Sequence, residues 1–184
     1  MSKTIIGAAA AALAAAALTV GSLAAPAGAA SIGVTDPADI DHGVDLRAVR
    51  VANGDKALRI VLNHTDLVRS PKSGAGGAVY IDTDPADKGP ELVFVGGYFV
   101  GTDYQLLHTE GFGVKKWGSV VDGFHELTLD YDKDKTKMRI SRQALGKVGD
   151  VRVAVRVAGE KSDGTKVVDW LHEPRSFTPW VSRG

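Results

Sequence analysis

The sequence predicts an all-β protein, an antiparallel β-sandwich with a jelly-roll-like layout of about nine or ten strands. Two observations carry this prediction. Apolar residues recur at every second position in several short segments, as on a pleated strand with one buried face. Beyond residue 30, no segment offers the ten or more residues of 3.6-residue periodicity that a substantial helix requires.

The beginning of the chain, residues 1–30, predicts a cleaved secretory signal peptide. Lys3 supplies a positive start, and an uncharged run of apolar and small residues covers 5–20. This run of about sixteen residues is shorter than the roughly 20 that span a bilayer. We therefore expect cleavage after Ala29 or Ala30, a secreted extracellular protein, and no membrane anchor after cleavage.

The bulk composition excludes several classes of protein. The 184 residues include no cysteine, so disulfides and a lipid-modified cysteine are excluded. Formal net charge is zero and no basic block stands out, which argues against nucleic acid and anionic membranes as partners. The exported part, about 150 residues, is long enough to bury one core without covalent staples.

The first expected elements form a hairpin. Residues 31–45 are an acidic segment, which we expect as a solvated arm ahead of one sandwich domain at 46–184. Strands at 46–52 and 58–62 flank Asn53-Gly54-Asp55, a sequence typical of hairpin turns.

The clearest strand is 151–157, where every second residue is Val. A helix would scatter these valines around its circumference, whereas a strand places them on one face and Arg152 and Arg156 on the other. A second hairpin is expected from 124–131 and 136–141, and one helical turn at 142–146. Further strands are expected at 78–83, 91–95, 98–100, 103–109, 165–171 and 177–181, with a bulge or bend at Gly96-Gly97.

The sharpest cluster of charge lies between two expected strands and suggests a calcium site. Hard cations take six to eight oxygen ligands, and closely spaced carboxylates supply them. The alternative is a structural turn, in which Asp accepts backbone N–H bonds and Pro and Gly set the geometry. The candidate calcium ligands are Asp82, Asp84, Asp87 and Glu91.

A second acidic group lies near the expected mature start. It comprises Asp36, Asp39, Asp41 and Asp45. If this segment met the loop at 82–91, like charges would crowd together and favour a bound cation. Without such convergence, the segment is a solvated arm.

Aromatic residues suggest a carbohydrate-stacking site. Trp117 follows two lysines in a segment bounded by glycines, which makes it the tryptophan with the best chance of exposure. Trp170 and Tyr98 and Tyr104 are the other candidate ligand-binding residues, although core packing is the alternative for each ring.

No catalytic motif stands out. The five histidines lack a zinc-ligand spacing, and the chain has no nucleophile elbow and no phosphate-binding glycine loop. A pair of carboxylates for glycoside hydrolysis stays open as an alternative, because acidic residues are abundant. We expect no enzymatic activity.

Short motifs carry a family resemblance across most of residues 40–184. They include Val79-Tyr80-Ile81-Asp82-Thr83-Asp84-Pro85, Gly101-Thr102-Asp103-Tyr104, Ile140-Ser141-Arg142 and the terminal Asp169-Trp170 with Trp180-Val181. Together they resemble uncharacterised exported proteins of high-GC Gram-positive bacteria and, more distantly, β-sandwich domains of the family 9 carbohydrate-binding module and DOMON type. The resemblance implies a sandwich and, on its sugar-binding branch, aromatic stacking residues. The haem-binding branch implies axial His or Met ligands, to which neither Met138 nor any histidine is matched.

The sequence therefore favours a secreted, non-enzymatic binding module. Its expected partner is an extracellular carbohydrate or protein, with calcium as the one cofactor to consider. Two alternatives remain: a secreted hydrolase that uses carboxylates, and a protein-interaction or inhibitor module with an exposed apolar patch or rigid loop.

Overall fold

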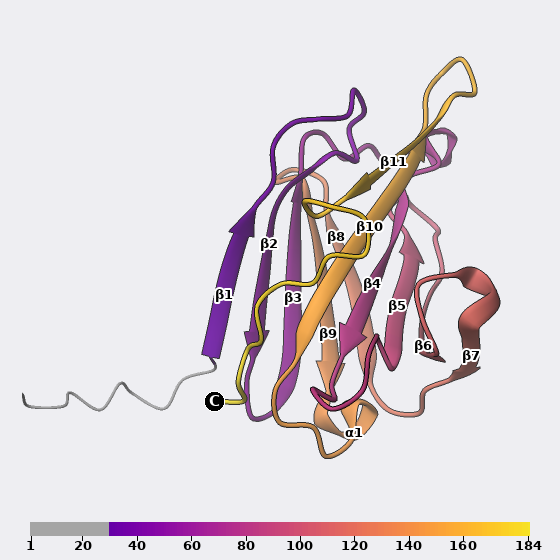
Figure 1. The fold of residues 1–184 in the computed structure, drawn as a ribbon. Helices are drawn as coiled ribbons and strands as arrows, with labels where there is room; N and C mark the ends of the chain where they lie inside the picture. Colours follow the sequence, from indigo (N-terminus) through magenta and orange to yellow (C-terminus); the bar gives the residue numbers. More distant parts are fainter. Residues whose placement is uncertain (1–29) are drawn as a thin grey trace, which may run out of the picture.

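Two antiparallel sheets pack face to face in the computed structural model, which describes residues 30–184 (Figure 1). The five-stranded sheet has the order β1 (Ala30–Thr35), β2 (Leu46–Asn53), β3 (Ala57–His64), β9 (Lys135–Ser141), β8 (His125–Asp130). The six-stranded sheet has the order β11 (Lys166–Trp170), β10 (Arg152–Glu160), β4 (Gly76–Asp82), β5 (Leu92–Gly97), β6 (Tyr104–Thr109), β7 (Trp117–Val120). Three short helical turns complete the described part: η1 (Pro71–Ser73), η2 (Val114–Lys116) and α1 (Arg142–Leu145). The predicted antiparallel β-sandwich is confirmed.

Both predicted hairpins form. Strands β2 and β3 pair across the Asn-Gly-Asp turn, with Val51 opposite Ile60, and β8 pairs with β9, with Leu127 opposite Met138. The single predicted helical turn is α1, whose first backbone donors are capped by the Ser141 hydroxyl, which accepts from the Ala144 N–H. In the described part of the chain no helix has the length and apolar character of a membrane span.

The acidic segment at 31–45 is not the solvated arm that we expected. Its first residues continue from Ala30 as β1, which pairs along its whole length with β2 and places Ile32 and Val34 against the core. Asp36 and Asp45 are buried rather than solvated. The sandwich therefore includes this segment. The predicted signal peptide lies, up to residue 29, outside the described residues, and its cleavage stays a prediction.

Two expected strands do not form. Gly96 and Gly97 continue β5 in register with β4, and the chain then turns at 98–101, which directs Tyr98 into the core instead of along a strand. The segment 177–181 makes only one bridge, between Val151 and Val181. The structure adds β1 and β7, which brings the described strands to eleven.

Alternation along the strands builds the core between the sheets. Val153, Val155 and Val157 of β10 are fully buried on the inner face, as the sequence predicts. They pack in one cluster with Leu58, Ile60 and other inward residues of the opposite sheet. Burial of one such side chain contributes about 1.5–3 kcal/mol, so the inner faces account for most of the stabilisation.

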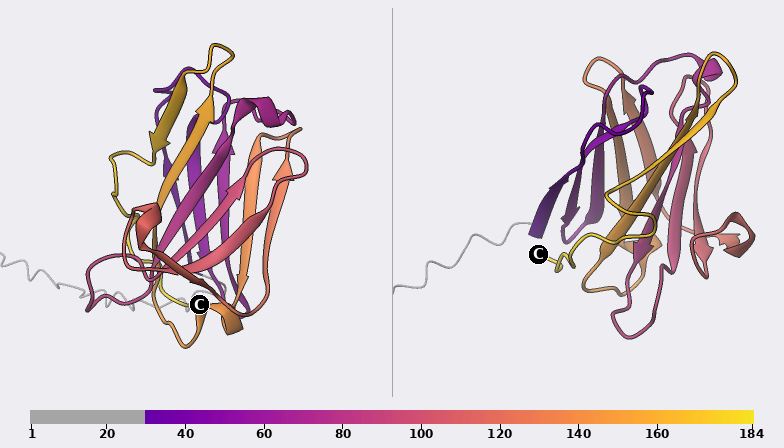
Figure 2. Two further views of the ribbon diagram at one scale, coloured as in Figure 1. Left: turned by 90° about the vertical axis from the view of Figure 1, so that its right-hand side faces the viewer. Right: turned by 45° about the horizontal axis from the view of Figure 1, so that its top comes forward.

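The last residues of the chain close one side of the sandwich. In Figures 1 and 2 this segment leaves β11, runs down beside β10 and ends near the lower ends of β1 and β2. Thr178 Oγ1 accepts from the Val153 N–H at 3.1 Å, and the Asn53 side-chain amide donates to the Val181 carbonyl at 2.7 Å. These bonds connect the C-terminal segment to one strand of each sheet.

Candidate functional site

The outer face of the six-stranded sheet carries an aromatic hollow of about 420 Å³. We call it the aromatic cleft and define it by six side chains. Its floor and walls come from β4, β10, β11, the loop that includes η2, and the C-terminal segment. The defining residues are Tyr80, Phe112, Trp117, Arg156, Trp170 and Arg175.

Strand register brings the floor of the cleft together. Arg156 lies in the middle, directly opposite Trp170 of β11 on one side and Ala78 of β4 on the other. Side chains opposite one another on neighbouring strands share a face. Because Val155 and Val157 point into the core, Arg156 must point outward, and Trp170 and Tyr80 lie on the same outer face.

The segment between β6 and β7 covers part of this floor. Tyr80 donates its hydroxyl to the Phe112 carbonyl at 2.7 Å, which anchors the covering segment to β4. The Tyr80 and Trp170 rings lie nearly parallel, with centroids 6.1 Å apart, and Phe112 lies across both at 4.8 and 6.0 Å. Trp117 follows η2 and is half-buried at the rim. The rings are therefore held in fixed orientations around an open volume.

The electrostatics of the cleft are positive. Its lining includes two arginines and no acidic side chain. Burial raises the pKa of Tyr80, while the charge of Arg156, the indole N–H of Trp117 and the charge of Arg175 act in the opposite direction. Both guanidinium groups thus lie close enough to the phenol to affect it. The Trp117 indole N–H, although near this oxygen, is buried without a well-aligned hydrogen bond.

Two of the four predicted sugar-binding aromatics, Trp117 and Trp170, meet in the cleft. Tyr98 lies instead in the core, fully buried, with its ring tilted against His64 at 5.4 Å. Tyr104 stacks on Phe94 at 5.8 Å, at a different place on the molecule. The cleft therefore contains both predicted tryptophans and neither predicted tyrosine.

Four residues of the cleft, Tyr80, Phe112, Arg156 and Arg175, were not singled out from the sequence. One signal was available for Arg156, because the alternation of β10 already placed it on the face away from the valines. Its position opposite Trp170 follows only from the strand pairing, which the local pattern does not determine.

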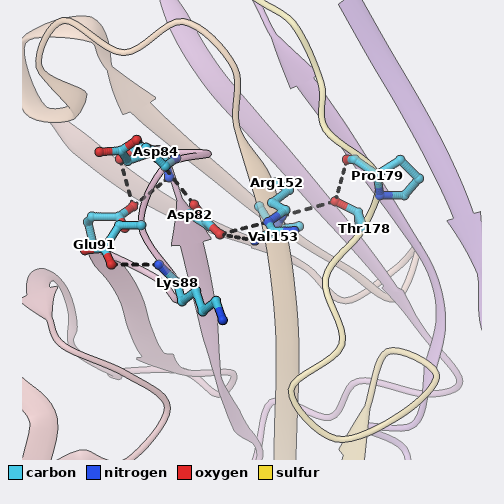
Figure 3. Close-up of polar contacts among 11 residues, drawn as sticks. Asp82, Asp84, Lys88, Glu91, Arg152, Val153, Thr178 and Pro179 are labelled. Carbon is cyan, nitrogen blue, oxygen red and sulfur yellow. Dashed lines mark hydrogen bonds and ion pairs between the residues drawn. The ribbon is translucent and has the colours of Figure 1, made fainter.

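The predicted calcium ligands lie at the end of β4 and in the loop that follows it, and their carboxylates have internal partners; Figure 3 labels Asp82, Asp84 and Glu91. Asp82 is fully buried and forms an ion pair with Arg152 at 2.6 Å. Glu91 Oε2 accepts from both the backbone N–H and the hydroxyl of Thr83, at 2.6 and 2.9 Å. Asp84 and Asp87 accept backbone N–H bonds within the loop. These contacts are those of a structural turn.

The acidic group near the start of the domain meets β11 and not the loop at 82–91. Asp36, Asp39 and Asp169 of β11 each place a carboxylate oxygen within 4.8 Å of the others. Asp45 instead closes its own loop by accepting from the Asp39 and Ile40 N–H groups.

Burial and neighbouring acids raise the pKa of Asp169 to about 6, and burial raises the pKa of Asp36 as well. The backbone N–H of Leu46 donates to Asp169, and that of His172 to Asp36, while Asp36 Oδ2 is buried without a partner. The Leu46 and His172 N–H groups already engage one oxygen of Asp169 and one of Asp36, and we assign no metal here.

A second hollow of about 500 Å³ also borders Trp117 and includes Glu91, His108 and Glu110. Two carboxylates in one hollow are what the hydrolase alternative requires. However, Glu91 Oε2 accepts hydrogen bonds from the backbone N–H and the hydroxyl of Thr83. The carboxylate of Glu110 lies 3.9 Å from the Lys116 ammonium group. Both acids of this hollow thus have hydrogen-bonding or cationic partners among the described residues.

The comparisons with known proteins add no relative. No family model matches the chain, and no curated protein or solved structure is significantly similar to it.

Proposed function

We propose that this chain is an exported, non-enzymatic module that binds carbohydrate in the aromatic cleft. The observation that carries the proposal is the meeting of Trp117 and Trp170 beside Tyr80 on an open sheet face. Flat aromatic faces pack against the C–H faces of sugar rings, and the rim supplies hydrogen-bond donors for hydroxyl groups. The leader-like residues 1–30 support export.

The rigidity of the cleft also supports binding. Trp170 is held between its strand partner Arg156 and the rings of Tyr80 and Phe112. A ring that is already oriented loses little conformational freedom when a ligand binds, so more of the contact energy appears as affinity. The acidic loop at 82–91 has no role in this proposal, because its carboxylates serve the turn.

Replacing the indole faces tests the proposal. We expect Trp170→Leu and Trp117→Leu each to weaken binding to a panel of soluble polysaccharides by at least about tenfold, equivalent to about 1.4 kcal/mol. Leucine keeps apolar volume in the wall while removing the flat face. Retention of the purified protein in affinity gel electrophoresis measures the change.

Phe124→Leu provides the matched control. Phe124 is an exposed ring immediately before β8, next to Arg139 of β9, and we expect its replacement to leave retention unchanged. Thermal melting of each variant separates loss of binding from loss of folding. Unaltered retention of both tryptophan variants would place the carbohydrate site elsewhere and contradict the proposal.

A further inference from the structure

The two arginines of the aromatic cleft lack a balancing charge. Arg156 and Arg175 form no ion pair with any carboxylate among residues 30–184, whereas Arg152, on the same strand and face as Arg156, is paired with Asp82. The protein as a whole has a net charge of zero. The positive charge in the cleft is therefore a local feature of this surface, not a reflection of an overall basic protein.

The position of Arg156 makes it available to a ligand. It is only partly exposed, and it lies between Trp170 and Ala78 on the floor of the cleft. On the β4 side, the cleft residues that share the outer face with Arg156 are Ala78 and Gly76, which are too small to cover its guanidinium. A partly shielded guanidinium between aromatic walls interacts more strongly with an anion than one in open water.

Arg175 approaches the same volume from the C-terminal segment. Its backbone is in the left-handed region, with φ of 66°, in a turn where the Ser176 N–H donates to the Glu173 carbonyl. This conformation is unfavourable for a residue with a β-carbon, by about 1 kcal/mol or more. The turn holds the exposed Arg175 at the cleft, opposite the floor residue Arg156.

We infer that the ligand of the aromatic cleft is an anionic sugar, a polysaccharide whose rings carry carboxylate groups. This inference rests on the proposed function and specifies its ligand. The indole face of Trp170 packs against the sugar ring, and the guanidinium groups of Arg156 and Arg175 bind the carboxylate. A planar guanidinium donates two parallel N–H bonds to a carboxylate, which favours the charged sugar over a neutral one of the same shape.

A matched pair of ligands tests this inference. Polygalacturonate and its fully methyl-esterified form have the same rings and linkages and differ in charge. We expect the charged polymer to bind at least about tenfold more tightly, with the preference weakening as salt is raised. Equal binding of the two polymers, or binding of neither, overturns the inference.

Arginine variants identify the source of the preference. The double variant Arg156→Gln and Arg175→Gln should reduce the preference to about twofold or less while still binding the esterified polymer. Arg59→Gln, an exposed arginine on β3 of the opposite sheet, removes charge without touching the cleft and should keep the full preference. Preference that survives the double variant contradicts the inference.

The outcomes separate this inference from the proposed function. Binding of neutral polysaccharides that depends on Trp170 but ignores charge would leave the proposed function standing and reject the anionic ligand. No binding of any polysaccharide, charged or neutral, would reject both. Thermal melting of the double variant shows that it is folded.

Discussion

Replacing Arg152 by methionine is expected to lower the free energy of unfolding by about 3–5 kcal/mol. Arg152 is opposite Asp82 across β10 and β4, and its Nε and terminal nitrogen contact Asp82 Oδ2 at 2.8 and 2.6 Å (Figure 3). Asp82 is fully buried, so methionine would leave a carboxylate without a counter-charge in the protein interior. Denaturant unfolding of the purified variant measures the loss.

The same guanidinium anchors the C-terminal segment. Its carbon lies 4.6 Å from the centroid of the Phe177 ring and 4.5 Å from that of Trp180. Loss of these cation–π contacts adds to the effect of the broken ion pair. The segment that closes the side of the sandwich should therefore loosen when Arg152 is replaced.

Two controls separate the ion pair from the loss of an arginine side chain. Arg156→Met removes an arginine from the same face of β10 without breaking an ion pair and should change stability by about 0.5 kcal/mol or less. The double variant Asp82→Leu with Arg152→Met removes both charges and should recover most of the loss. If Arg152→Met costs no more than Arg156→Met, the ion pair has no structural role.

The second large effect concerns pH and the buried His64. Its Nδ1 lies 2.8 Å from the Val44 carbonyl, which can only accept, so Nδ1 carries the proton and Nε2 accepts from Thr136 Oγ1 at 3.1 Å. The imidazole is thus neutral, and burial lowers the pKa of His64 from 6.5 to about 4, although Asp134 and Asp45 oppose the shift.

The unfolded chain takes up this proton before the folded protein does. The stabilisation is therefore fully present above pH 6.5 and is lost as the pH falls from 6.5 to about 4. At about 1.4 kcal/mol per pKa unit, the loss amounts to about 3 kcal/mol. Urea unfolding at a series of pH values measures it.

A His64→Gln variant isolates this contribution. The pKa of Asp169 is raised to about 6, so this residue increases the free energy of unfolding as the pH falls over part of the same range. In the wild-type curve alone, this increase masks the loss caused by His64. Asp169 is present in both proteins, so the difference between their unfolding free energies reports His64. We expect this difference to shrink by about 3 kcal/mol from pH 7 to pH 4; parallel curves would mean that His64 is not a buried neutral group.

Local alternation was enough to predict the layers of the sandwich. Val153, Val155 and Val157 face the core because a strand repeats every two residues, and this period needs no tertiary information. Strand β1 is not predicted in this way, although Ile32 and Val34 alternate with small residues, because the acidic residues that follow favour a solvated segment.

Positions that depend on distant contacts could not be predicted in this way. Tyr98 is buried because Gly77 of β4 has no side chain where the Tyr98 hydroxyl lies; an added β-carbon there would be 2.3 Å from that oxygen. Asp36 and Asp169 likewise meet from opposite sheets. Both arrangements depend on contacts between segments that are distant in the sequence, which a local pattern does not contain.

Only part of the candidate site could be predicted, because the site also depends on contacts between distant segments. The sequence indicated Trp117 and Trp170 as separate exposed or edge rings, but the arginines that join them in one cleft required the β10–β11 register and the path of the C-terminal segment. The cleft is formed by elements that are remote in the chain.

Carbohydrate binding in the aromatic cleft is tested most directly by titrating the isotope-labelled protein with polygalacturonate fragments and following the indole N–H signals of its three tryptophans. Trp117 and Trp170 line the aromatic cleft, whereas Trp180 stacks on Arg152 outside it. We expect the Trp117 and Trp170 signals to shift together and saturate while the Trp180 signal stays in place. Saturable binding that moves only Trp180, or none of the three signals, would contradict it.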